Sequence, residues 1–263
     1  MSESEPEYRT IQQTGFFFTK IPLELRRRIY DFALGEEMLR VEVEGPKLKA
    51  WRCSKITWGF WTGDDWTKEL YYNWKYLNHP AADEEEEDWK WHRHQGNVNL
   101  LRTCRQVYLE AVSSLYSTQT FVLAIGDHKD EADKPTLLYL PYFILPQRLD
   151  QIRFLYIHWS LDPEPFLHLG ISQKTLARWT ECWDMLSKFP NLQDLRIRFE
   201  CAESRITDWQ PLEAQLKERT SRIKVAKKFV VVVPFQQTEL ELGVGDSNCE
   251  FRVPENRIDT AIE

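Results

Sequence analysis

The chain has 263 residues, with 34 Lys and Arg against 41 Asp and Glu, so its formal net charge is −7. An acidic balance argues against a general binder of the nucleic-acid backbone, because such binding rests on a basic surface. Hydrophobic residues make up 42% of the sequence, which is enough for a folded core and too many for a disordered chain. The length fits one large domain or two small ones.

Both the acidity and an excess of tryptophan are local. Residues 83–88 are six consecutive acidic side chains, and without them the rest of the chain is nearly neutral. Seven of the 11 tryptophans lie between Trp51 and Trp91, where the sequence has no helical or strand period. We interpret residues 45–96 as a Trp-rich insertion whose acidic run is a solvated loop.

The cysteines and histidines form no recognisable metal or disulfide pattern. The cysteines are odd in number and contain no C-x-x-C pair, and the neighbouring His92 and His94 have no further ligand at a zinc spacing. We therefore expect no metal and no cofactor. The cysteines are Cys53, Cys104, Cys182, Cys201 and Cys249.

The sequence contains no targeting or membrane segment. Residues 1–15 form a polar tail without the apolar core of a signal peptide, and no apolar stretch reaches the roughly 18 residues of a membrane span. We expect no membrane partner and an intracellular protein, cytoplasmic or nuclear.

The first predicted element is a helix with Pro22 in its first turn, where the missing N–H costs nothing. Leu25, Ile29 and Phe32 recur at helical spacing and form one apolar stripe, while residues 26–28 are arginines that occupy the other directions.

The next elements alternate between strand and helix. Gly35 can end the first helix, and residues 39–44 alternate like a short strand that Gly45 and Pro46 terminate. Residues 99–118 predict one long helix, and residues 120–124 a buried strand. The expected stripe of the long helix is Leu101, Cys104, Tyr108, Ala111, Val112 and Leu115.

An internal repeat follows. The pattern Ile-x-x-Leu-x-Ile-x-Trp at residues 152–159 returns as Leu-x-x-Leu-x-Ile-x-Phe at residues 192–199, and this is the core pattern of a leucine-rich-repeat strand. Residues 172–189 between the copies predict an amphipathic helix, with Ser172 as its N-cap. A strand, a helix and a strand in that order predict parallel pairing. The apolar face of this helix is Leu176, Trp179, Trp183 and Leu186.

A third unit has a helix over residues 208–223 and a strand over 229–233, followed by short strands near 238–242 and 249–253. Residues 255–263 are a tail. The domain organisation is then a helical part at 16–44 and 97–118, the insertion at 45–96, and an α/β part at 119–254, all within one composite domain.

Alternation along the repeated strands separates two faces. The face that carries Leu155, Ile157, Trp159 and their counterparts is expected under the helices. In leucine-rich-repeat architectures the opposite, open face recognises ligands, and aromatic residues beside arginines suit an acidic peptide. The alternative is that the insertion or its acidic run covers this face. The predicted target-binding residues are Phe154, Tyr156, His158, Arg196 and Arg198.

A family resemblance rests on two short motifs. Ile-Pro-Leu-Glu-Leu-x-x-x-Ile at residues 21–29 and Leu-Leu-Arg-Thr-Cys-Arg-Gln-Val-Tyr at residues 100–108 resemble the two halves of an F-box. With the strand pattern after them, the chain is similar to a fungal F-box-like protein family of unknown function. The resemblance covers most of the chain outside the insertion, which interrupts a motif that is continuous in a true F-box.

The resemblance implies an α+β or α/β fold, with an F-box-like helical N-terminal part packed on a mostly parallel, leucine-rich-repeat-like sheet that has helices on one face. It also implies a substrate adaptor that docks on the Skp1 subunit of a cullin ubiquitin ligase and holds an unknown protein target. The residues that match the docking motif are Ile21, Pro22, Leu23, Leu25, Ile29, Leu101 and Cys104.

Two alternatives remain. In the first, the F-box-like helices are only structural core and the chain is a stand-alone protein- or ligand-binding domain. Burial of Ile21, Leu25 and Ile29 would favour that reading. In the second, the chain is an enzyme, but the sequence has no G-x-S-x-G turn, H-E-x-x-H helix, phosphate loop or dinucleotide motif. We therefore expect a non-enzymatic interaction module without catalytic residues.

Overall fold

The computed structural model describes residues 15–35, 38–52, 98–126, 135–161, 173–201, 206–235, 240, 243–244 and 248–253. The expected tails lie outside these ranges, apart from Gly15. The acidic run and most of the insertion also lie outside them. The described helices are α1 (Phe16–Lys20), α2 (Leu23–Leu34), α4 (Val98–Leu101), α5 (Arg105–Ser117), α6 (Thr136–Phe143), α7 (Pro146–Leu149), α8 (Gln173–Leu186) and α9 (Ile206–Ser221). The described strands are β1 (Met38–Glu44), β2 (Lys47–Arg52), β3 (Thr120–Ile125), β4 (Phe154–Ser160), β5 (Asp194–Glu200), β6 (Lys228–Val232), β7 (Gly243–Val244) and β8 (Glu250–Arg252).

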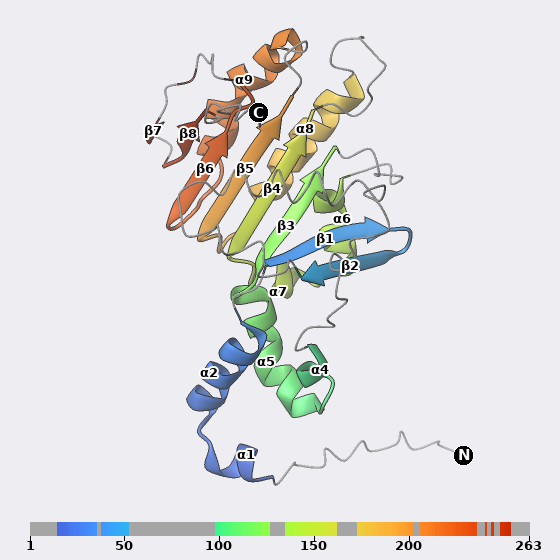
Figure 1. The fold of residues 1–263 in the computed structure, drawn as a ribbon, viewed down its shortest axis with the longest axis vertical. Coiled ribbons are helices and arrows are strands. Elements are labelled where there is room, and N and C mark those ends of the chain that lie inside the picture. Colours follow the sequence, from blue (N-terminus) through green and yellow to red (C-terminus); the bar gives the residue numbers. More distant parts are fainter. Residues whose placement is uncertain are drawn as a thin grey trace, which may run out of the picture.

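These strands form one sheet in the order β2-β1-β3-β4-β5-β6-β8-β7 (Figure 1). The six adjacent strands β1, β3, β4, β5, β6 and β8 run parallel. The antiparallel pairs β1–β2 and β7–β8 lie at the two edges. The predicted mixed α/β class with a mostly parallel sheet is therefore confirmed.

The repeated strand motif is in register across the sheet. Leu155 pairs with Leu195, Ile157 with Ile197 and Trp159 with Phe199. Because parallel strands in register place equivalent residues side by side, each row of the motif forms one layer of the core. The parallel pairing and the inward direction of these residues were both predicted from the repeat.

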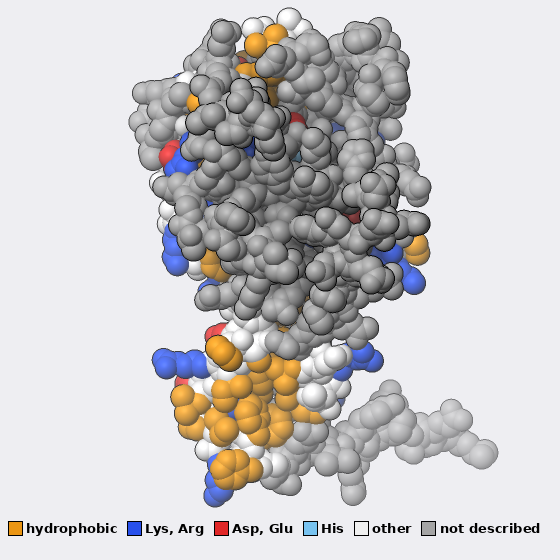
Figure 2. Space-filling view, in the orientation of Figure 1, with side chains coloured by type: hydrophobic (Ala, Val, Ile, Leu, Met, Phe, Trp, Pro, Cys, Tyr) orange, Lys and Arg blue, Asp and Glu red, His pale blue; other side chains and the backbone are white. Residues whose placement is uncertain are grey.

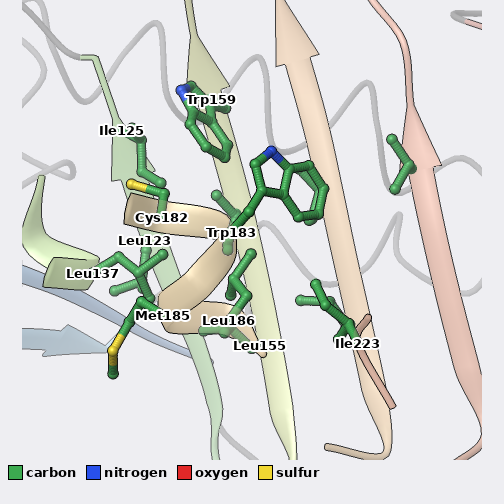
Figure 3. Close-up of a cluster of buried hydrophobic side chains, with 14 of the residues drawn as sticks. Leu123, Ile125, Leu137, Leu155, Trp159, Cys182, Trp183, Met185, Leu186 and Ile223 are labelled. Atoms are coloured by element: carbon green, nitrogen blue, oxygen red, sulfur yellow. The ribbon is translucent and has the colours of Figure 1, made fainter. Parts of the chain in front are cut away.

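Helices α8 and α9 cover one face of the sheet (Figure 1), and large aromatic side chains fill the space between the two layers. Trp159 lies 4.8 Å from Trp179 between ring centroids, and Phe199 lies 5.2 Å from Trp209. Figure 3 shows Trp183 of α8 among the strand side chains of this core. The apolar face of α8 holds as predicted, except that Leu176 is 40% exposed.

Helices α1, α2, α4 and α5, which we call the stem, project beyond the amino-terminal ends of the parallel strands (Figure 1). The stem has a small hydrophobic cluster of its own, separate from the cluster under the sheet. Tyr116 of α5 packs against both clusters and stacks on Phe121 of β3 at 6.1 Å. The buried members of the stem cluster are Tyr30, Leu34, Leu101, Val107, Ala111 and Val112.

The structure differs from the sequence prediction in the long helix. Instead of one helix over residues 99–118, α4 ends at Leu101 and α5 begins at Arg105. Cys104 takes the N-cap position of α5, where its sulfur accepts a hydrogen bond from the Val107 N–H at 3.4 Å. The break rotates the stripe, so that Val107 is buried and Tyr108, which was expected inside, is 44% exposed.

The predicted domain boundaries also shift at the first strand. Residues 38–44 were assigned to the helical part, but β1 pairs in parallel with β3 and so belongs to the sheet. Residues 47–52 were assigned to the insertion, but they form β2 and pair with β1 across a turn at Gly45, whose φ is 57°. The predicted insertion therefore begins no earlier than residue 53, and residues 53–97 lie outside the described part of the chain.

Candidate functional site

Helix α2 has its buried and exposed faces exchanged relative to an ordinary surface helix, and we call this arrangement the inversion of α2. Its buried residues are Arg26, Tyr30 and Leu34. The predicted apolar stripe faces outward, with Leu25 50%, Ile29 42% and Phe32 92% exposed. An amphipathic helix normally buries its apolar stripe. This one buries an arginine and leaves the stripe uncovered in the chain itself.

A network of hydrogen bonds around Glu110 holds Arg26 in the interior. The Arg26 Nε and Nη2 atoms donate to the two carboxylate oxygens of Glu110, each at 2.8 Å. Nη1 of Arg26 donates to the backbone oxygens of Phe18 and Ile21 at 3.1 and 2.6 Å. Tyr30 donates its hydroxyl to Glu110 at 3.0 Å. The network thus joins α2, α5 and the segment that enters α2.

This network fixes the charge state of its members. The hydrogen bonds from Arg26 hold the pKa of Glu110 below its ordinary value, although partial burial opposes the shift. Burial and the neighbouring carboxylate raise the pKa of Tyr30 to about 12. At neutral pH the pair is therefore ionised and the tyrosine is a neutral donor. The rotation of α2 about its axis is set by this contact.

The outward stripe lines a shallow groove of about 470 Å³ on α2 and the residues before it. Its apolar members, which we call the outer face of α2, are Ile21, Pro22, Leu25, Ile29 and Phe32, and Lys20 and Arg28 border them. Figure 2 shows hydrophobic side chains gathered over the stem, with Lys and Arg at the margins. Such a patch is typical of a protein interaction site.

The structure brings together four of the seven predicted docking residues, namely Ile21, Pro22, Leu25 and Ile29. Leu23 is half-buried and does not line the groove. Leu101 is 8% exposed inside the stem cluster, and Cys104 acts as a helix cap that packs on the same cluster, so neither lines the groove. Those two residues shape the stem rather than its surface.

Three groove residues were not among the predicted docking residues: Lys20, Arg28 and Phe32. The helical spacing of Phe32 with Leu25 and Ile29 was visible in the sequence. We missed it as a site residue because such a stripe normally forms core.

The predicted target-binding face of the sheet is not open at its centre. Tyr156 and His158 are buried, with 9% and 4% of their surface exposed, while Phe154, Arg196 and Arg198 are half-buried. Their shared face is as predicted, since Tyr156 pairs with Arg196 and His158 with Arg198. A role for these residues in target binding stays a prediction.

The polar residues on this face make close internal contacts. Arg196 donates to both Asp194 oxygens at 2.9 and 2.7 Å, and its guanidinium lies 4.7 Å from the Tyr156 ring centroid. Burial, together with Asp194, raises the pKa of Tyr156 to about 12. His158 Nε2 lies 2.9 Å from Glu200 Oε2. These contacts fix the side chains in place.

The described part of the chain contains no group of three or more His, Cys, Asp or Glu side chains arranged to hold a metal ion. In the same part, none of the helices is both long and apolar enough to cross a membrane.

Neither the curated proteins nor the solved structures contain a match to this chain. One family model does match, described as a domain of unknown function (DUF7730), and it covers residues 10–254. The matched region includes both the stem and the sheet. Because the match spans most of the sequence, the chain belongs to this family.

Proposed function

We propose that the protein is a non-enzymatic interaction module of the F-box-like type, a substrate adaptor that binds a Skp1-like subunit of a cullin ubiquitin ligase inside the cell. The outer face of α2 is the docking surface, and the α/β part holds the target protein. The observation that carries the proposal is the inversion of α2.

Two features of α2 support docking. A fully exposed side chain of this kind gains roughly 1.5–3 kcal/mol on burial, so the 92% exposed Phe32 gains most of that amount and the 50% exposed Leu25 about half. Such a stripe favours a partner that covers it. Arg26, whose charge would normally face water, is instead held inside by its ion pair with Glu110. The apolar stripe therefore faces solvent as a result of specific internal contacts rather than by loose packing.

The competing reading, in which these helices serve only as core of a stand-alone binding domain, requires Ile21, Leu25 and Ile29 to point inward. Leu25 and Ile29 are exposed, and the half-buried Ile21 lines the groove beside them. These positions favour the adaptor over the stand-alone domain.

The test is binding of purified Skp1 to the full chain, measured by co-purification and by calorimetry. The double substitution Ile29→Asp/Phe32→Asp puts two charges into the centre of the face. We expect it to weaken the complex at least about tenfold, because central apolar anchors carry most of the energy of an interface. Both side chains are exposed, so circular dichroism should show an unchanged fold.

Tyr142→Asp is the matched control, since Tyr142 is 76% exposed on α6, away from the stem. It adds a charge at an exposed aromatic residue and should leave Skp1 binding unchanged. If the wild-type chain does not bind Skp1 at micromolar concentrations, the adaptor proposal fails. Equal binding by the wild type and by Ile29→Asp/Phe32→Asp would show that the outer face of α2 is not the docking surface.

A further inference from the structure

The segments that lead into β4, β5 and β6 place a row of basic side chains along the amino-terminal edge of the sheet. Residues 148–153, 188–193 and 222–228 contain seven Lys or Arg and a single acidic residue, Asp150. This concentration stands out in a chain whose formal net charge is −7. Because the parallel strands are in register, their entry segments lie side by side at one edge.

Most of these charges have no partner among the described residues. Five of the basic residues make no ion pair within the part of the chain that the structure describes, whereas Arg222 pairs with Glu218 and Arg148 bonds to the side chains of Ser113 and Gln151. Charges that a fold leaves unpaired at one edge create a local positive potential. The five are Arg153, Lys188, Lys224, Lys227 and Lys228.

A groove of about 840 Å³ runs along the same edge, between the entry segments and α5. Arg153 and Lys224 lie in its lining together with one acidic residue, Asp150, and the exposed Pro190 and Ala226 contribute apolar surface. The half-buried side chains of Ser117 and Gln193 also line it, and neither makes a side-chain hydrogen bond among the described residues. The groove therefore offers positive charge, polar groups and apolar contact together.

The lining is held in shape by cross-links between successive entry segments. Asn191 donates from Nδ2 to the backbone oxygen of Asp150 at 2.7 Å, and Asn248 donates to that of Val225 at 3.2 Å. The Ala226 N–H donates to the Leu192 oxygen at 2.9 Å. A preformed groove loses little entropy when a ligand binds.

We propose that this groove binds an acidic, extended segment of a partner protein. Carboxylates of the segment pair with Arg153 and Lys224, while its backbone and apolar side chains contact the polar and apolar lining. A peptide fits better than a nucleic acid, because the basic residues form one short row on an acidic protein and the lining includes apolar surface. The site is separate from the outer face of α2 and does not depend on Skp1 binding.

The experiment uses fluorescence anisotropy of the full chain with a labelled peptide of alternating Glu and Val. The control peptide replaces Glu by Gln. We expect saturable binding of the acidic peptide alone, and weaker binding as salt rises from about 50 to about 300 mM, because exposed charges are screened. The double substitution Arg153→Glu/Lys224→Glu should weaken binding at least about tenfold.

The matched control is Arg27→Glu/Lys47→Glu, which makes the same change of charge at two exposed residues outside the groove. It should leave peptide binding unchanged. A parallel set of proteins in which residues 83–88 are replaced by Asn and Gln removes the chain's own acidic run as a competitor. Tighter binding in that set, abolished again by Arg153→Glu/Lys224→Glu, would also support the proposal.

Three results would overturn it: no saturable binding in either set, equal binding after the groove substitutions, or stronger binding of a single-stranded oligonucleotide that competes with the peptide. Skp1 binding is measured on the same proteins. A wild-type chain that binds Skp1 but not the peptide would refute this site without refuting the adaptor proposal.

Discussion

Arg26 and Glu110 lie 84 positions apart in the sequence and form a two-point ion pair between α2 and α5. The side chains are only 9% and 13% exposed, so each depends on the other for neutralisation. A buried charge that loses its partner is strongly unfavourable. The pair therefore ties the rotation of α2 to α5, and with it the direction of the apolar stripe.

A pH experiment tests this contact at the residue scale. The pKa of Glu110 in the folded state is below its ordinary value of 4.5, so its interactions stabilise the fold above about pH 4.5 and are lost as the pH falls through the folded pKa. Glu110→Gln should lower the urea midpoint at pH 7. The difference in unfolding free energy from the wild type should shrink as the pH falls below about 4.5.

Glu24→Gln is the control for this prediction, because Glu24 is exposed on the same end of α2 and makes no ion pair with the residues that the structure describes. It should leave the urea midpoint at pH 7 nearly unchanged. A wild-type chain and a Glu110→Gln variant with the same midpoint at pH 7 would contradict the role given to the pair.

The inversion of α2 was not predictable from local sequence. Leu25, Ile29 and Phe32 follow the spacing of a core stripe, and three consecutive arginines follow the pattern of a solvent face. What reverses the helix is Glu110, in a segment that lies beyond the insertion. A pattern within one helix contains no information on such a distant partner, so the burial of Arg26 could be seen only in three dimensions.

At the scale of elements, the repeated strands were the most predictable part of the chain. Their order, parallel pairing and inward residues follow from the pattern Leu-x-Ile-x-aromatic in β4 and β5, because alternation and a helix between two strands leave few arrangements. The hairpin strand β2 was missed. Residues 47–52 alternate well, but their position beside the Trp-rich segment led us to assign them to the insertion.

The end of β3 gives a prediction for strand packing. Gly126 follows β3 with a φ of 81°, and a Cβ atom there would lie 2.0 Å from the backbone oxygen of Ser160 at the end of β4. Gly126→Ala should therefore lower the free energy of unfolding by about 2 kcal/mol or more, through backbone strain and a clash that no side-chain motion relieves. Urea denaturation measures the change.

Gly15→Ala is the matched control. Gly15 has a φ of −60°, and a Cβ atom there would meet nothing within 4 Å, so the change should cost less than about 0.5 kcal/mol. A Gly126→Ala variant as stable as the wild type would show that β3 and β4 do not approach as closely as described.

At the scale of the whole molecule, the two hydrophobic clusters differ greatly in size. Six buried residues form the stem cluster, whereas the cluster under the sheet includes four buried tryptophans and many aliphatic side chains. Local stability follows the amount of apolar surface that a region buries. The stem should therefore open more easily than the sheet.

Native-state hydrogen exchange tests this difference. Amides of α2 should exchange through local opening at denaturant concentrations where amides of β4 and β5 still require global unfolding. If the outer face of α2 binds Skp1, the complex should raise the protection of α2 and leave that of β5 unchanged. Equal protection of α2 and β5 in the free chain would mean that stem and sheet unfold as one unit.

The hairpins β1–β2 and β7–β8 limit where this sheet could gain a further strand and helix. The parallel array from β1 to β8 is bounded at each side by an antiparallel partner, and the outermost strand β2 carries Lys47, Lys49 and Arg52. Charged outer strands resist further pairing. A variant with an additional strand and helix would have to gain them between existing units, so we expect its two terminal hairpins to stay unchanged.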